Sequence, residues 1–242
     1  MDQFNSSWRF IFKNFKNLIS LGLPWLIFTI ISLVLIANKL PQIQIDETVA
    51  LDLAINQLMS TLTQFYENNA SKLFIIDLMT SILFVAFIGS LNIQFKNISN
   101  MKTPQNFFKI SKKIYLKIPY LFIASFITSI LVQFGLLILI FPGVYLFARL
   151  SLYPIYISLE NKGPLESLKC SWNATDEFGG KLTVYTLLIF ILLVITTILT
   201  SSLLALTSIG LMFIVPVILF ETAIFSMVLS YIYYSLYKFL EK

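Results

Sequence analysis

Six apolar runs dominate the sequence, and each approaches or exceeds the length needed to cross the hydrocarbon core of a bilayer. About 20 apolar residues are enough for one helical crossing, and helices and closed barrels are the structures that satisfy their backbone hydrogen bonds in lipid. The pattern predicts an all-α, polytopic membrane protein with six transmembrane helices in a single membrane domain, 1–242. The runs cover residues 18–37, 73–93, 119–141, 144–159, 184–207 and 211–236.

The composition limits the chemistry that such a domain can perform. Hydrophobic residues make up 57% of the chain, histidine is absent, and Cys170 is the single cysteine. A disulfide framework, a Cys/His metal site and imidazole acid/base catalysis are therefore excluded. We expect a protein that is not an enzyme and that uses no cofactor.

Lysine and arginine predict the orientation. Of the 17 Lys and Arg residues, Arg149 lies inside an apolar run, and only Lys39 and Lys72 lie in the loops on one side. The others lie before the first run, in two loops on the opposite side, and in the tail. The positive-inside rule predicts that both termini lie on the cytoplasmic side of the membrane. It also accounts for most of the net charge of +5 without a nucleic-acid partner.

The loops on the outer side differ in length. Pro142-Gly143 and Ser208-Ile209-Gly210 are short enough to predict two tight hairpins. Residues 38–72 are longer, and their apolar residues recur at helical spacing, which predicts an outer amphipathic helix over about 47–67. Asp46 is its expected N-cap and Asn68-Asn69 its expected end. The apolar positions are Leu51, Ile55, Leu58, Leu62 and Phe65.

A basic amphipathic segment precedes each odd-numbered run, so the same unit is expected three times: interfacial helix, span, outer connection and returning span. In TPQNFFKISKKIYLKIP, for example, the lysines recur every four residues opposite an apolar stripe. These cytoplasmic interfacial helices either anchor the bundle or recognise anionic lipid headgroups. The expected partners are thus membrane lipids, anionic ones included, and the expected contacts are Arg9, Lys13, Lys109, Lys113 and Lys117.

Three ionisable residues fall within the apolar runs: Asp77, Arg149 and Glu221. A charge in the membrane is costly, so it is expected to be paired or functional. Counted at about 1.5 Å of rise per residue, Arg149 reaches either Asp77 or Glu221 by extending its side chain along the helix. Arg149 then serves the bundle structurally or binds an anionic ligand. Glu221, five residues after Pro216, is either a protonated structural residue or a proton- or substrate-binding carboxylate.

The middle of the chain carries a recognisable pattern. A Pro-Gly hairpin at Pro142-Gly143 and a proline at Pro154 are followed by an exit at Glu160-Asn161 and the motif ENKGPLESLKCSW, with Ser171 and Trp172 at its end. In these features the chain resembles the YciC-like family of uncharacterised bacterial inner-membrane proteins. The resemblance implies a polytopic protein of the bacterial inner (plasma) membrane and transfers no catalytic residues.

These observations favour a non-enzymatic envelope protein, one that interacts with lipid or with other membrane proteins. The alternative is a transporter, channel or lipid-handling protein that uses Arg149 and Glu221.

Overall fold

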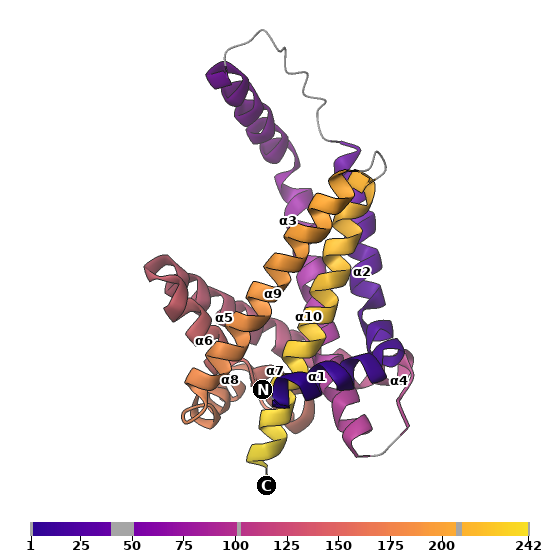
Figure 1. The fold of residues 1–242 in the computed structure, drawn as a ribbon, viewed down its shortest axis with the longest axis vertical. Helices are drawn as coiled ribbons and strands as arrows, with labels where there is room; N and C mark the ends of the chain where they lie inside the picture. Colours follow the sequence, from indigo (N-terminus) through magenta and orange to yellow (C-terminus); the bar gives the residue numbers. More distant parts are fainter. Residues whose placement is uncertain (1, 40–50, 101–102, 207–209, 242) are drawn as a thin grey trace.

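The computed structural model describes residues 2–39, 51–100, 103–206 and 210–241, and within these ranges the chain is helical with no strand. The expected fold class is therefore confirmed. The elements, coloured along the chain in Figure 1, are α1 (Asp2–Lys13), α2 (Phe15–Ala37), α3 (Leu51–Ser99), α4 (Phe107–Ile114), the 3-10 turn η1 (Tyr115–Lys117), α5 (Ile118–Ile138), α6 (Ile140–Leu150), α7 (Tyr153–Glu160), α8 (Pro164–Ala174), α9 (Gly179–Ala205) and α10 (Gly210–Leu240).

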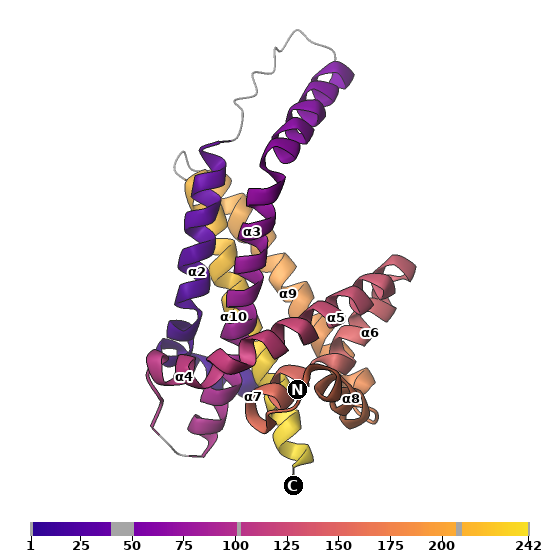
Figure 2. The same cartoon turned by 180° about the vertical axis from the view of Figure 1, so that it is seen from behind.

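Six apolar helical stretches are long enough to cross a membrane, as the hydropathy pattern predicts. They cover Phe15–Ala37, Ile55–Ser99, Phe107–Ile138, Ile140–Glu160, Gly179–Ala205 and Phe213–Leu240. Helices α2, α3, α9 and α10 run along the long axis of the molecule, and α5 and α6 form a hairpin that is inclined to them (Figures 1 and 2). The chain is thus a multi-pass membrane protein.

The hairpin between α5 and α6 turns earlier than predicted. Leu139, with φ −162° and ψ 156°, is the extended residue between the two helices, and Pro142 and Gly143 lie inside the first turn of α6. Pro142 is tolerated there because the first backbone N–H groups of a helix have no partner within it. Gly143 instead serves close packing: a Cβ on Gly135 would lie 2.7 Å from the Gly143 Cα.

The fourth apolar run is not one straight span over 144–159. It divides into α6 and α7 around Ser151 and Leu152, just before Pro154. A proline cannot donate the backbone hydrogen bond that would continue α6, and its ring disfavours helical backbone in the preceding residue. The predicted fourth span is therefore interrupted at Ser151 and Leu152, which changes the surroundings of Arg149.

The predicted outer amphipathic helix is not a separate element. Residues 51–67 form the start of α3, which continues through Asn68 and Asn69 without a break. The Asn69 side-chain amide donates to the Phe65 carbonyl oxygen at 2.9 Å, a bond made within the helix, so this asparagine does not end it. Figure 2 shows the first part of α3 extending away from the bundle. Asp46, the expected N-cap, lies outside the described residues, as do Ser208 and Ile209 of the second predicted hairpin.

Short helices precede the odd-numbered spans as predicted: α1 before α2, α4 with η1 before α5, and α8 before α9. They lie at the end of the bundle where both chain termini lie (Figure 1). The apolar stripe of α1 packs on the bundle itself. Trp8 meets Phe225 edge to face at 5.4 Å, and Phe10 stacks on Tyr231 at 3.9 Å. Aromatic contacts of this kind fix α1 against α10.

Candidate functional site

A cavity of about 540 Å³, partly open to the outside of the molecule, lies between the helices of the bundle. Its volume is within the size range of small-molecule sites in proteins. Its wall comes from α2, α3, α5, α10 and the region where α6 meets α7. Lining residues on α3 extend from Thr80 to Asn92, which corresponds to about 18 Å along the helix axis. The space is therefore elongated along the spans.

The wall is mainly apolar, includes uncharged polar groups and carries no permanent charge. Lys, Arg, Asp and Glu are absent from the lining residues, which combine aromatic and aliphatic side chains with hydroxyl and amide groups. An unpaired charge in such a place would be costly to desolvate, whereas hydroxyls can bond to nearby backbone. The polar residues of the wall are Thr80, Ser81, Asn92, Ser125, Thr128, Ser129, Ser151, Tyr153, Thr222, Ser226, Ser230 and Tyr233.

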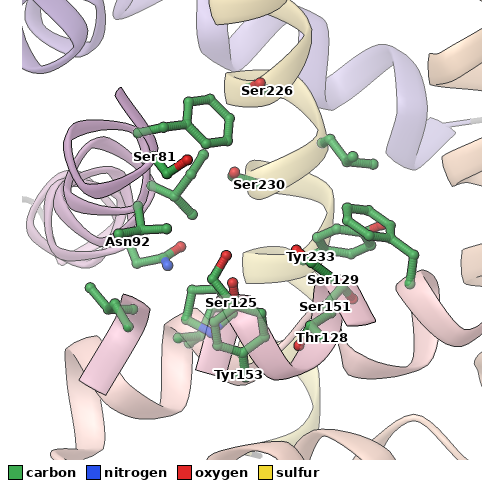
Figure 3. A pocket seen from close by; sticks show the side chains of 18 of the residues that line it. Ser81, Asn92, Ser125, Thr128, Ser129, Ser151, Tyr153, Ser226, Ser230 and Tyr233 are labelled. Atoms are coloured by element: carbon green, nitrogen blue, oxygen red, sulfur yellow. The ribbon is translucent and has the colours of Figure 1, made fainter. Parts of the chain in front are cut away.

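Figure 3 shows how the polar side chains face one another across this space. Ser226, Ser230 and Tyr233 follow one side of α10, while Ser81 and Asn92 approach from α3. Because residues four and seven apart share a helix face, α10 presents a continuous polar stripe there. Uncharged polar residues at helical spacing inside an apolar run were the sequence signal for this site, and the charge-based reasoning above missed it.

Some of the cavity hydroxyls are already satisfied by the protein. Thr128 donates to the Ala124 carbonyl at 2.8 Å, and Ser151 donates to the Ala148 carbonyl at 2.7 Å. The Tyr233 hydroxyl lies 2.7 Å from the Thr186 hydroxyl of α9. These groups give the wall its polarity without requiring a ligand.

The break between α6 and α7 forms one part of the cavity wall, through Ser151, Tyr153 and Pro154. Two buried hydroxyls support this break, one from α8 and one from the residue that follows it. Ser171 donates to the Arg149 carbonyl at 2.8 Å and accepts from the Leu152 N–H at 3.0 Å. Thr175 donates to the same Arg149 carbonyl at 2.9 Å. Since buried backbone groups need partners, Ser171 and Thr175 stabilise the interruption.

The local sequence ENKGPLESLKCSW explains why α8 can reach the break. Asn161 ends α7 in the left-handed conformation, with φ 59°, a common way for a helix to terminate. Gly163 then precedes Pro164 at the first position of α8, where a proline costs no hydrogen bond. The resulting sharp turn lets Ser171, near the end of α8, lie against Leu152.

Arg149 belongs to this support and does not line the cavity. One guanidinium nitrogen, Nη2, donates to the Trp172 carbonyl at 2.8 Å and to the Asp176 carboxylate at 2.9 Å. The other, Nη1, donates to the Asp176 carbonyl at 3.2 Å. The guanidinium also lies 4.3 Å from the centre of the Trp172 ring. A cation at the carboxyl end of α8 is favoured by the carbonyl groups exposed there.

The predicted pairing of Arg149 with Asp77 or Glu221 was therefore wrong. The arginine side chain is 3% exposed, and its acidic partner Asp176 lies in the connection to α9 with 79% of its side chain exposed. The error follows from the broken fourth span. Because α6 ends at Leu150, Arg149 lies beside α8. Helix α8 lies at the end of the bundle that holds both termini (Figure 1).

Two adjacent glycines test how tightly this arginine is held. A Cβ on Gly179 would lie 2.7 Å from the Arg149 Cδ, whereas a Cβ on Gly180 would meet nothing within 4 Å. We expect Gly179→Ala to lower the unfolding free energy by about 1 to 3 kcal/mol, because the fixed arginine cannot move aside. Gly180→Ala should be neutral or stabilising by up to about 1 kcal/mol, because alanine favours the helix.

The measurement is thermal unfolding of the two purified variants in the same detergent. Equal melting temperatures for Gly179→Ala and Gly180→Ala would contradict the close contact. Both positions lie in the first turn of α9, so helix propensity does not explain a difference in melting temperature between the two variants.

The two acids within the apolar runs, Glu221 and Asp77, lie apart from the cavity. Glu221 is half-buried on α10 and accepts a hydrogen bond from the Thr197 hydroxyl of α9 at 3.1 Å. Asp77 lies on an exposed face of α3. Neither residue lines the cavity, so the structure does not gather Asp77, Arg149 and Glu221 into one polar site.

The basic residues expected to meet anionic lipid fall into two groups. Arg9, Lys13 and Lys109 are exposed on α1 and α4. Lys113 is exposed as well and donates to the Gln105 side chain at 2.9 Å. Lys117 is different, because it is half-buried and donates to the Ser158 carbonyl of α7 at 2.6 Å, which ties the start of α5 to α7.

A second cluster of charged residues lies at the carboxyl end of α7. Lys162 lies 2.9 Å from the Glu160 carboxylate, and its ammonium lies 4.7 Å from the centre of the Tyr156 ring. The hydrogen bond with Glu160 raises the pKa of Lys162 above its ordinary value. Tyr237 of α10 bonds to the same Glu160 at 2.8 Å. The end of α7 is thereby joined to α10.

Comparison with known proteins gives matches to membrane proteins. A protein of Photorhabdus laumondii is 38% identical over 56 residues, 23% of this chain and 22% of that relative. One from Buchnera aphidicola of Schizaphis graminum is 25% identical over 170 residues, 69% of this chain and 68% of the relative. One from Buchnera of Acyrthosiphon pisum is 30% identical over 120 residues, 46% of this chain and 48% of the relative. All three are named UPF0259 membrane proteins.

The relatives are thus bacterial membrane proteins of an uncharacterised family. The first match spans about a fifth of the relative's own length, and the longest spans about two thirds. No family model matches the chain, and no solved structure matches it. The chemistry of the cavity is consequently the main guide to a function.

Proposed function

We propose that this chain is a YciC-like, non-enzymatic protein of the bacterial inner membrane that holds an uncharged lipid or similar amphiphile in its central cavity. The observation that carries the proposal is the cavity itself: about 540 Å³, elongated along the spans, and lined by hydroxyls and aromatic rings without a permanent charge. An acyl chain suits the apolar part of such a wall, and an uncharged polar group suits the hydroxyls.

The same proposal places the termini and the short helices α1, α4 and α8 on the cytoplasmic side. Arg9, Lys13, Lys109 and Lys113 are exposed on α1 and α4, where anionic headgroups of the inner leaflet would attract them. Lipids are therefore the proposed partners at two places: anionic headgroups at the surface and an uncharged molecule inside.

Transport through Arg149 and Glu221 has less support. Arg149 makes its contacts with α8 and its connection to α9, and Glu221 bonds to Thr197; neither side chain contributes to the cavity wall. A pathway that relies on these two charges would have to run outside the cavity.

Native mass spectrometry of the gently extracted protein tests the proposal. We expect the wild-type protein to retain an uncharged lipid. Ser226→Phe, which places a ring in the cavity from α10, should reduce the retained lipid about tenfold or more, because the space is filled and a polar group is lost. Ser202→Phe is the matched control, since Ser202 is exposed on α9 and outside the cavity.

Filling the cavity from the opposite wall guards against a folding defect in one variant. Ser81→Phe on α3 should have the same effect as Ser226→Phe. A wild-type protein that emerges without lipid would overturn the proposal. Retention of the lipid by both folded cavity variants would overturn it as well.

A further inference from the structure

Two polar atoms in the residues that line the cavity are buried and have no hydrogen-bond partner in the protein. They are Nε1 of Trp25, on α2, and Oδ1 of Asn92, on α3. Trp25 is 5% exposed and Asn92 is 1% exposed, so neither group reaches bulk solvent. Buried polar groups are nearly always bonded, which makes this pair an exception in need of a partner.

The two atoms require opposite hydrogen-bonding partners. An indole N–H can only donate, so Trp25 needs an acceptor. A carbonyl oxygen can only accept, so Asn92 Oδ1 needs a donor. Thr128, Ser151 and Thr222 of the wall donate their hydroxyl hydrogens to backbone carbonyls, so these hydrogens are not available to Asn92 Oδ1.

The two side chains belong to different levels of the cavity wall. The Trp25 ring lies 5.1 Å from the Phe84 ring and 6.2 Å from the Phe87 ring, ring centre to ring centre. Asn92 follows these residues on α3 by five to eight positions, which is about 8 to 12 Å along the axis. A partner for both groups therefore presents polar atoms along part of its length and not at a single point.

We propose that the cavity selects an uncharged lipid that carries both an acceptor, bonded by the Trp25 indole N–H, and a hydroxyl donor, bonded to Asn92 Oδ1. This inference rests on the proposed function and specifies its substrate class. An acylglycerol has this chemistry, with an ester carbonyl, free hydroxyls and an acyl chain. A hydrocarbon lacks both groups, and a phospholipid brings a phosphate for which the described wall has no cation.

Three probes separate the two groups: 1-monolauroylglycerol offers an acceptor and donors, methyl laurate offers an acceptor only, and n-tetradecane offers neither. Each probe competes with tritiated 1-monolauroylglycerol for the full-length protein in phosphatidylcholine nanodiscs. Partitioning into the nanodisc is the same for every variant, so it cancels when ratios of affinities are compared between variants.

Trp25→Phe should reduce the preference for methyl laurate over tetradecane about tenfold, because it keeps an aromatic ring and removes the N–H. Asn92→Leu should reduce the preference for the glycerol ester over methyl laurate about tenfold, because it removes the acceptor and keeps the side-chain size. Trp25→Phe should leave the preference for the glycerol ester over methyl laurate unchanged, and Asn92→Leu should leave the preference for methyl laurate over tetradecane unchanged. Trp8→Phe and Asn97→Leu are controls outside the cavity and should change neither.

Unchanged preferences in both folded cavity variants would show that the two atoms meet only water, and would overturn the inference. A change in only one variant would overturn recognition by two groups. The wild-type protein supplies a check that needs no variant. If its affinities for the three probes only reflect how strongly each probe partitions into the nanodisc, the inference is overturned as well. The proposed function is tested separately, because Ser226→Phe should release bound lipid whichever polar groups recognise it.

Discussion

Arg149→Met is expected to lower the unfolding free energy by about 3 kcal/mol, whereas Asp176→Asn should lower it by less than about 1 kcal/mol. The asymmetry follows from burial. The arginine is 3% exposed and its guanidinium contacts three oxygen atoms within 3.2 Å, two of which are backbone carbonyls near the end of α8. Methionine fills a similar space and leaves those carbonyls without their donor.

Asp176 contributes much less to the unfolding free energy, because 79% of its side chain is exposed. Water solvates the carboxylate when the ion pair is broken. An exposed partner makes a weak pair even where the cation is buried. The arginine also keeps its bonds to the Trp172 and Asp176 carbonyls in the Asp176→Asn variant, since both acceptors are backbone atoms.

Thermal unfolding of the three proteins in one detergent checks this expectation. Arg149→Lys provides an intermediate, because an ammonium is a single donor centre and cannot match the planar fork of the guanidinium. If Asp176→Asn destabilised the protein as much as Arg149→Met, the ion pair and not the bonds to the carbonyls would be the main contribution. If Arg149→Met had no effect, the arginine would not hold α8 to the break between α6 and α7.

The fold class was predictable because it depends on hydrophobicity averaged over about 20 residues. Six apolar stretches and three short helices before the odd-numbered spans both appear in the structure. The boundaries were harder, because they depend on single residues in context. Pro142-Gly143 is a common turn sequence, yet the chain turns at Leu139 and uses Gly143 for close packing.

The partner of Arg149 could not be predicted because it depends on the interruption at Ser151 and Leu152. A straight fourth span carries the arginine toward the membrane interior, where Asp77 and Glu221 were the available acids. A broken span carries it to α8, where Asp176, outside every apolar run, is within reach. Pro154 was the visible sign of the break, although a proline alone does not distinguish a kink from the start of a new helix.

The cavity was missed for a different reason. Its polar side chains are uncharged, and single serines and threonines in membrane helices usually serve close packing. The spacing of Ser226, Ser230 and Tyr233 on α10 and of Ser125, Thr128 and Ser129 on α5 does place each set on one helix face. Only the arrangement of the helices shows that the two faces border the same space (Figure 3).

Gly135→Ala and Gly143→Ala should each destabilise the protein by about 3 kcal/mol, because the α5–α6 hairpin has no room for a methyl group between its helices. A Cβ on Gly135 would lie 2.7 Å from the Gly143 Cα, and a Cβ on Gly143 would lie 2.8 Å from the Leu136 backbone nitrogen. Both contacts are with backbone, which cannot rotate aside as a flexible side chain can. The helices must move apart instead.

Separation of the two hairpin helices should change the shape of the cavity as well as lower the melting temperature. Helix α5 supplies Ser125 and Thr128 to the wall, and α6 supplies Phe147, so a displaced hairpin opens the space between the spans. We therefore expect Gly135→Ala and Gly143→Ala to lose retained lipid in native mass spectrometry, while Gly180→Ala, which meets nothing within 4 Å, retains it. A hairpin variant that melts early but still holds its lipid would show that the binding space does not depend on how closely α5 and α6 approach.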